Sequence, residues 1–234
     1  MHLLQAQAGE IGDGTEPVDP GQSPADIVVI SANDAELAAL AGAQAGLGED
    51  APTLRLARLD WLRHPYSVDL YLDATLRHSK LVIVRLLGGE GYWPYGVEQL
   101  AARLGAAGVP LAFLPGDDKP DENLARQTAM AAADRRALWA YLVEGGPENA
   151  ANFLRYAAHL LGRGPQPPGA APLLRAGVYL PGGTGDGMIG DLDALKQRWI
   201  GGQPVAAVVF YRALLQGAGL EPVDRIAEAL SAEG

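Results

Sequence analysis

The sequence of 234 residues predicts an α/β fold with a doubly wound, mainly parallel sheet flanked by helices. Three observations predict it. Short and almost unbroken apolar runs recur along the chain, as expected for parallel strands that are covered on both faces. Segments with apolar residues at helical spacing lie between these runs. Glycine and proline cluster at the junctions, where turns are needed.

The predicted strands are the short apolar runs. They are Met1–Gln5, Ile27–Ser31, Leu81–Leu87, Leu111–Leu114, Gly177–Leu180 and Val205–Phe210. Each is too short to be a complete buried helix, and each is followed by a polar or Gly-rich segment. We therefore expect the carboxyl ends of several strands to open into loops.

The predicted helices are the periodic segments between these strands. They are Asp34–Gly46, Ser67–His78, Tyr95–Leu104, Asp134–Val143, Glu148–Leu161 and Pro222–Ala232. Ser67 is a possible cap of the second helix, and Pro94 suits the first turn of the third. Gly145, Gly146 and Pro147 separate the fourth helix from the fifth.

A stretch rich in proline and glycine at residues 162–169 predicts a linker, because it can neither continue a helix nor enter a central strand. The predicted organisation is a Rossmann-like or flavodoxin-like domain over residues 1–161 that ends in a helix pair, a linker over 162–172, and the start of a second α/β unit over 173–234. The last helix has no strand after it, so we expect this unit to be truncated.

Charge and composition exclude several classes of function. Residues 1–50 hold nine acidic and no basic residues, whereas the rest of the chain is nearly neutral. Nucleic acid and anionic membranes need a basic surface, so neither is an expected partner. Without cysteine or paired histidines there is no complete zinc-type ligand set, so no metal site is predicted. No apolar run reaches about 18–20 residues and no signal peptide is visible, so we expect a cytoplasmic protein.

The candidate site lies at the carboxyl ends of the strands, where open α/β sheets bind ligands. Three of these ends are followed by polar, charged or aromatic residues that could bind a ligand. They are Ala32-Asn33-Asp34, the loop Gly88–Gly96 after the strand that contains Arg85, and Pro115–Asp118. We expect these loops to converge on one face.

Arg85 stands inside an apolar strand, and a buried guanidinium needs a partner. One interpretation is a fork that binds a ligand carboxylate. The alternative is an internal pair with Asp73, Glu90 or Asp117. Both interpretations stay open from the residues alone.

Other side chains near these ends also have two interpretations. Tyr92, Trp93 and Tyr95 form either a contact for a planar apolar ligand or a plug over the sheet edge. Asp117 and Asp118 either bind a hard cation or cap a helix that begins near Asp121. His64 either binds a metal or makes a structural hydrogen bond.

A different hypothesis is nucleotide binding. Residues Gly185–Gly190 match the pattern G-x-G-x-x-G after a predicted strand and before a helical segment. The acidic residue expected about 20 positions later is missing, and the chain has no P-loop. This hypothesis is therefore the weaker one.

Five short motifs, taken in order, resemble the N-terminal region of the aerobic cobaltochelatase large-subunit family, CobN, which is related to the large subunit of magnesium chelatase. They are Arg63–Tyr71, Val84–Gly96, Leu114–Asp118, Tyr141–Asn149 and Val209–Arg212. The resemblance covers essentially the whole chain.

The resemblance implies ATP-dependent insertion of cobalt into hydrogenobyrinic acid a,c-diamide in cobalamin synthesis. It implies that the large subunit holds the corrinoid and that partner subunits of the AAA+ type hydrolyse ATP, so no cofactor is expected on this segment. Family members are several times longer, with their catalytic region elsewhere, so no catalytic residue is assigned. The expected ligand-binding residues are Arg85, Tyr92, Trp93, Tyr95, His64, Asp117 and Arg212. The alternative function is a non-catalytic interaction module.

Overall fold

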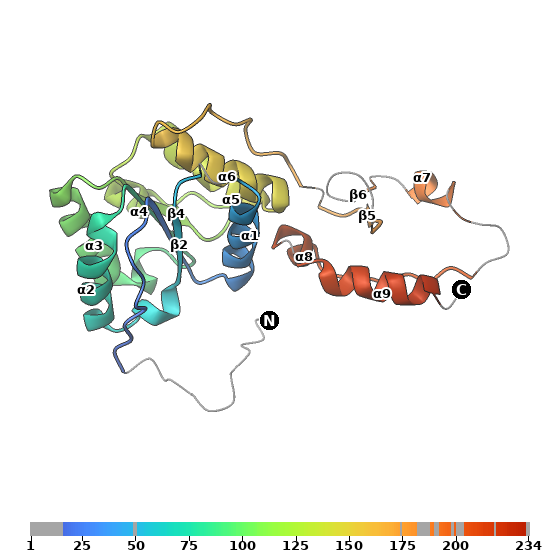
Figure 1. Cartoon of the computed structure of the whole chain (residues 1–234), viewed down its shortest axis with the longest axis horizontal. Coiled ribbons are helices and arrows are strands. Elements are labelled where there is room, and N and C mark those ends of the chain that lie inside the picture. Colours follow the sequence, from blue (N-terminus) through green and yellow to red (C-terminus); the bar gives the residue numbers. More distant parts are fainter. Residues whose placement is uncertain are drawn as a thin grey trace. The chain divides into compact units, whose positions relative to one another are not determined.

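A computed structural model of the chain describes residues 16–48, 51–173, 175–181, 188–189, 192–197, 199, 204–217 and 219–232 (Figure 1). Contacts divide the chain into two compact units. Unit 1 consists of Met1–Ala32 and Pro52–Ala132, and unit 2 consists of Asn33–Ala51 and Ala133–Gly234. The predicted strand Met1–Gln5 lies outside the described residues. The predicted break at residues 162–172 contains neither helix nor strand, and the domain division drawn from the sequence stays a prediction.

Unit 1 is built on a four-stranded parallel sheet, which confirms the α/β fold class. The strands are β1 (Ile27–Ser31), β2 (Leu54–Arg58), β3 (Leu81–Leu86) and β4 (Leu111–Pro115), in the order β2-β1-β3-β4. The register aligns Arg85 of β3 with Ser31 of β1 and Leu114 of β4. All residues of β1, β3 and β4 are buried, which explains their unbroken apolar runs.

Strand β2 was not predicted from the sequence. Its residues, Leu-Arg-Leu-Ala-Arg, include two arginines that interrupt the apolar run, and most of them are only half-buried. This strand is at the edge of the sheet, where one side of the backbone has no neighbouring strand. An edge strand needs less apolar surface than a central one, so the search for buried runs missed it.

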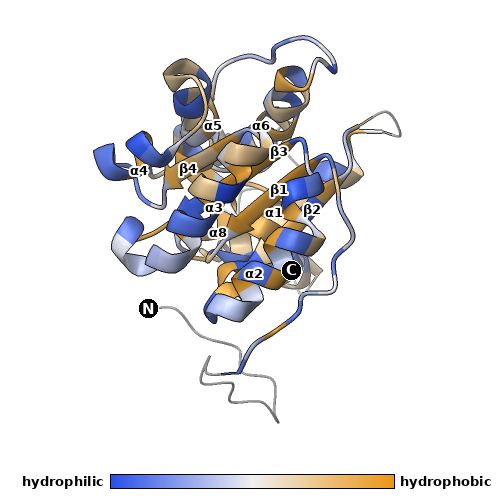
Figure 2. Cartoon of the chain, turned by 90° about the vertical axis from the view of Figure 1, so that its left-hand side faces the viewer, coloured by the Kyte–Doolittle hydropathy of each residue, from blue (hydrophilic) through white to orange (hydrophobic). Residues whose placement is uncertain are grey.

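Helices α2 (Pro65–Ala74) and α3 (Pro94–Ala107) pack on one face of the sheet of unit 1. Val84 and Phe113, which point to that face, are fully buried and share a core with Leu72 of α2 and Leu100 of α3. Figure 2 shows these strands in the orange of hydrophobic residues, with blue hydrophilic residues on the helices outside them. Short 3-10 turns complete the connections at Leu59–Leu62, Leu76–His78 and Glu90–Tyr92.

The beginnings of the helices follow from local chemistry. Helix α2 begins at Pro65, and its N-cap is His64, whose Nδ1 accepts a hydrogen bond from the Tyr66 backbone N–H at 3.1 Å. Ser67, the cap predicted from the sequence, is instead buried inside the helix, and its Oγ accepts a bond from the Val18 N–H. Helix α4 (Glu122–Gln127) begins after Asp121, as expected from the sequence.

Unit 2 is mainly helical. Its elements are α1 (Asp34–Ala45), α5 (Ala132–Glu144), α6 (Pro147–Leu160), β5 (Val178–Tyr179), β6 (Met188–Ile189), α7 (Leu192–Lys196), α8 (Arg212–Gln216) and α9 (Glu221–Ala232). Helices α1 and α6 contact one another, and the two short strands pair antiparallel. The predicted strand at Gly177–Leu180 is confirmed in its central two residues.

The strand predicted at Val205–Phe210 is wrong for this structure. Residues 204–211 are neither helix nor strand, and Val209 is 94% exposed. An unbroken apolar run forms a buried strand only where a sheet receives it. Among the described residues of unit 2, the only sheet is the pair β5 and β6.

Tyr71 makes the stability of unit 1 sensitive to alkaline pH. Its side chain is buried, and its hydroxyl donates to Gln22 Oε1 at 2.6 Å. Burial raises the pKa of Tyr71 above its usual value of 10, and the nearby charge of Arg55 opposes this shift. Because the folded pKa is raised, this stabilisation is complete below about pH 10 and is lost as the pH rises further. We expect Tyr71→Phe to flatten the fall in unfolding free energy above about pH 10, measured by urea denaturation. The exposed Tyr92→Phe is the control, and an unchanged slope for Tyr71→Phe would contradict the assignment.

Candidate functional site

The loops that follow β3 and β4 meet at the carboxyl edge of the sheet. The Gly116 N–H donates to the Leu86 carbonyl at 2.8 Å, and a Cβ on Gly116 would lie only 2.6 Å from the Leu87 Cα. Gly89 has a φ of +69°, and a Cβ there would lie 2.6 Å from Asp121 Oδ2. Glycine is therefore required where the two loops touch. The convergence expected of these two strand ends is confirmed, whereas Asn33 at the third end caps α1 in unit 2.

Arg85 fixes this edge from inside the sheet. Its side chain is 8% exposed, and it donates to two backbone carbonyls, from Nε to Pro115 O at 3.2 Å and from Nη2 to Gly116 O at 3.1 Å. Burial lowers the pKa of Arg85 to about 10, and the nearby charge of Asp117 opposes that shift. The guanidinium remains a cation at neutral pH. These two bonds hold the end of β4 in place. Binding of a ligand carboxylate by Arg85 stays a prediction.

The three aromatic residues of the Gly-rich loop face different surroundings. Trp93 is 5% exposed, belongs to the core, and donates from Nε1 to the Leu62 carbonyl at 2.7 Å. Tyr95 donates from its hydroxyl to Asp69 Oδ2 at 2.9 Å. Tyr92 alone of the three is strongly exposed, at 51%. Trp93 is therefore not available to a ligand, Tyr95 is partly exposed, and Tyr92 is the most exposed of the three rings.

Tyr95 belongs to a polar network that joins α2 to α3. Asp69 accepts from Tyr95 and from Arg103, which also pairs with Asp73. The hydrogen bond to the Asp69 carboxylate is the main reason why the pKa of Tyr95 is raised. These side chains hold two helices together, so their observed role is structural.

The remaining predicted residues are spread over both units. His64 caps α2, which matches the structural interpretation of that histidine. Asp117 is exposed, and its Oδ1 accepts from the Lys119 N–H at 3.2 Å. Arg212 belongs to unit 2, where it donates to the Leu173 carbonyl at 3.1 Å and lies 3.7 Å from Glu144 Oε2.

Two hypotheses on ligands receive no further support. Of the Gly185–Gly190 motif, only Met188 and Ile189 fall within the described residues, where they form β6. The described part of the chain contains no group of His, Cys, Asp or Glu side chains that could hold a metal ion. It also contains no helix long and apolar enough to cross a membrane.

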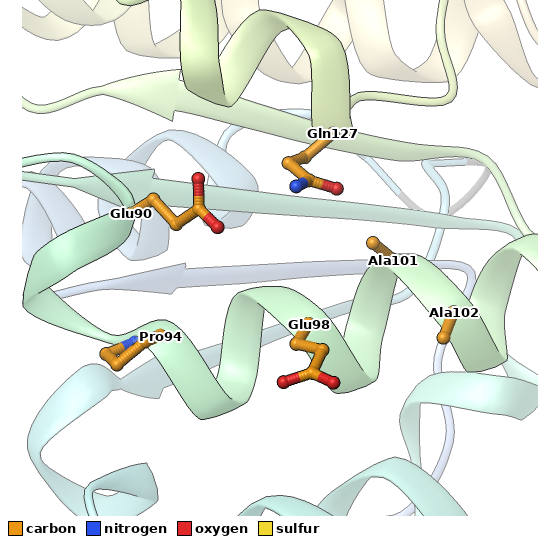
Figure 3. Close-up of a pocket in the computed structure, with 6 residues that line it drawn as sticks. All are labelled: Glu90, Pro94, Glu98, Ala101, Ala102 and Gln127. Carbon is orange, nitrogen blue, oxygen red and sulfur yellow. The ribbon is translucent and has the colours of Figure 1, made fainter.

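A hollow of about 520 Å³ lies beside the Gly-rich loop (Figure 3). It is lined by Glu90, Pro94, Glu98, Ala101, Ala102 and Gln127. Neither Glu98 nor Gln127 is among the site residues predicted from the sequence. Glu98 follows Pro94 by four positions and so shares a helix face with it. This spacing could have placed Glu98 beside the Gly-rich loop from the sequence alone. Gln127 comes from α4, and only the fold brings it to α3.

Comparison with known proteins gives consistent matches. Residues 139–234 match a family model described as CobN/Magnesium Chelatase. The chain is 44% identical over 238 residues to the aerobic cobaltochelatase subunit CobN of Sinorhizobium sp, and 39% identical over 237 residues to that of Pseudomonas aeruginosa. Both alignments cover 100% of this chain but only 19% and 18% of the two relatives.

A solved structure supports the fold. The catalytic subunit of cobaltochelatase from Mycobacterium tuberculosis superposes with a TM-score of 0.64 at 21% identity, over 89% of this chain and 15% of that one. At this identity the likeness concerns the fold alone. The sequence matches along the whole chain carry the assignment further: the chain belongs to the CobN/magnesium chelatase family and spans about a fifth of the length of its curated relatives.

Proposed function

We propose that the chain is a segment of a cobaltochelatase large subunit, and that the complete subunit takes part in ATP-dependent insertion of cobalt into hydrogenobyrinic acid a,c-diamide. The observation that carries this proposal is the 44% and 39% identity, along the entire chain, to two CobN subunits. The family resemblance implies that ATP is hydrolysed on partner subunits of the AAA+ type, and the lack of a P-loop in this sequence is in accord with that. Cobalt and the corrinoid are then substrates of the assembly.

Within this proposal, unit 1 contributes a corrinoid contact at the carboxyl edge of its sheet. The exposed ring of Tyr92 supplies an apolar surface for the macrocycle. Arg85 acts as a positioning residue, because its guanidinium holds the carbonyls of Pro115 and Gly116 and thereby the loop that packs against Leu87. The hollow with Glu90 and Glu98 is acidic and does not suit substrate carboxylates.

Binding of the diamide to a complete CobN subunit that carries this segment tests the contact. We expect Tyr92→Ala to raise the Kd for the diamide about tenfold, which corresponds to about 1.4 kcal/mol. Tyr66→Ala is the matched control, because Tyr66 is an equally exposed tyrosine on α2, 55% against 51%. Fluorescence titration gives both values. Equal Kd values for the two variants would remove Tyr92 from the site.

A further inference from the structure

An apolar segment in unit 2 lies open to solvent. Residues 204–211, Pro-Val-Ala-Ala-Val-Val-Phe-Tyr, carry no charge. Val205 is 60% exposed, Val209 is 94% exposed and Tyr211 is 87% exposed. Contiguous apolar surface of this kind is rare on proteins that function alone and marks a contact with other protein.

The segment is held at its C-terminal end, whereas its valines are uncovered. The Phe210 ring meets the Tyr179 ring edge to face with centroids 5.9 Å apart, and the Tyr179 hydroxyl donates to Asp224 Oδ1 of α9 at 2.6 Å. On the following helix α8, Leu215 is buried, and the Gln216 carbonyl accepts from the Gly146 N–H at 2.8 Å. The segment is therefore attached to the rest of unit 2 and still presents its valines outward.

Helix α9 adds an apolar stripe that is uncovered after its first residue. Val223, Ile226 and Leu230 recur at i, i+3 and i+7, the spacing of one helix face. Val223 is buried, whereas Ile226 is 48% exposed and Leu230 is 44% exposed. An apolar run followed by an amphipathic helix is the pattern of a strand and its covering helix in a parallel sheet.

The size of the relatives points to the occupant of this surface. The chain spans 19% and 18% of two CobN subunits, so about four fifths of such a subunit is additional protein. We propose that Val205–Phe210 is an interior strand of a second parallel sheet, whose other strands come from that additional part, and that α9 packs on it through Ile226 and Leu230. The inference rests on the proposed function only in taking the chain as a segment of a larger subunit.

Hydrogen exchange distinguishes the two states of the segment. The probe is the Pseudomonas aeruginosa CobN subunit with its matching region replaced by this chain, compared with the 234-residue chain alone. We expect the backbone amides of residues 205–210 to exchange at least about a hundredfold more slowly in the complete subunit, since interior strands open rarely. Fast exchange in both would overturn the proposal. Slow exchange in the chain alone that depends on its concentration would also overturn it, in favour of pairing with a second copy.

A substitution in the segment gives a second test of the proposed strand. Val209→Asp is expected to lower the thermal midpoint of the complete subunit by several degrees and to leave that of the chain alone unchanged, because Val209 is exposed there. Val18→Asp, at a 42% exposed valine of unit 1, is the control and is expected to be neutral in both. An unchanged midpoint for Val209→Asp in the complete subunit would refute the strand. If Tyr92→Ala leaves the Kd for the diamide unchanged while residues 205–210 exchange slowly in the complete subunit, only the corrinoid contact is refuted.

Discussion

Trp93→Ala is expected to lower the free energy of unfolding of unit 1 by about 3–5 kcal/mol, the usual cost of truncating a buried large aromatic side chain. The indole is 5% exposed and packs in the core with α2, α3 and the sheet. Its removal leaves a cavity and also leaves the Leu62 carbonyl without the indole N–H that donates to it at 2.7 Å. Both effects act in the same direction.

The neighbouring residue provides the control for this experiment. Tyr92 belongs to the same loop but is 51% exposed, so Tyr92→Ala is expected to change stability by no more than about 0.5 kcal/mol. Urea denaturation followed by circular dichroism measures both variants. Equal losses for the two variants would mean that Trp93 is not a core residue.

Gly96→Ala is expected to lower the free energy of unfolding, whereas a Gly-to-Ala substitution inside a helix usually raises it. Alanine normally stabilises a helix by roughly 0.5–1 kcal/mol relative to glycine. In α3, however, a Cβ at Gly96 would lie 2.0 Å from Cε2 of the Trp93 ring. The ring would have to leave its place in the core, so we expect a loss of about 3 kcal/mol, the upper end of typical overpacking costs.

Gly105 of the same helix is the matched control for Gly96. Nothing lies within 4 Å of a Cβ placed there. Gly105→Ala should therefore raise the unfolding free energy by about 0.5–1 kcal/mol through helix propensity alone. The same denaturation measurement applies, and stabilisation by both substitutions would show that the Trp93 ring does not rest on Gly96.

The central strands were predictable because burial on both faces leaves a direct pattern in the sequence. The apolar runs that begin at Ile27, Leu81 and Leu111 all became strands. The pattern failed where the environment of a segment differs from that of a central strand. Strand β2 lies at the sheet edge and its apolar run is interrupted by two arginines. Residues 205–210, in contrast, have the pattern of a buried strand but pair with no strand among the described residues.

The candidate site was predictable in position but not in detail. The rule that ligands bind at the carboxyl ends of parallel strands correctly located the loops of β3 and β4 at one edge. Which ring of the loop faces solvent depends on packing between distant residues, such as Trp93 with Leu62. Two of the groups that Arg85 binds are backbone carbonyls, which every residue possesses, so no residue type in the sequence marks them.

The two units alternate along the chain, and this order affects when their helices can pack during synthesis. Helix α1 ends at Ala45, but its contact α6 begins only at Pro147, roughly 100 residues later. At about 5–20 residues per second, a ribosome needs roughly 5–20 s to supply that partner. Leu37 and Leu40, which are buried in the folded chain, stay uncovered by α6 during this delay. The contact between α1 and α6 therefore forms only after the strands of unit 1 have been synthesised.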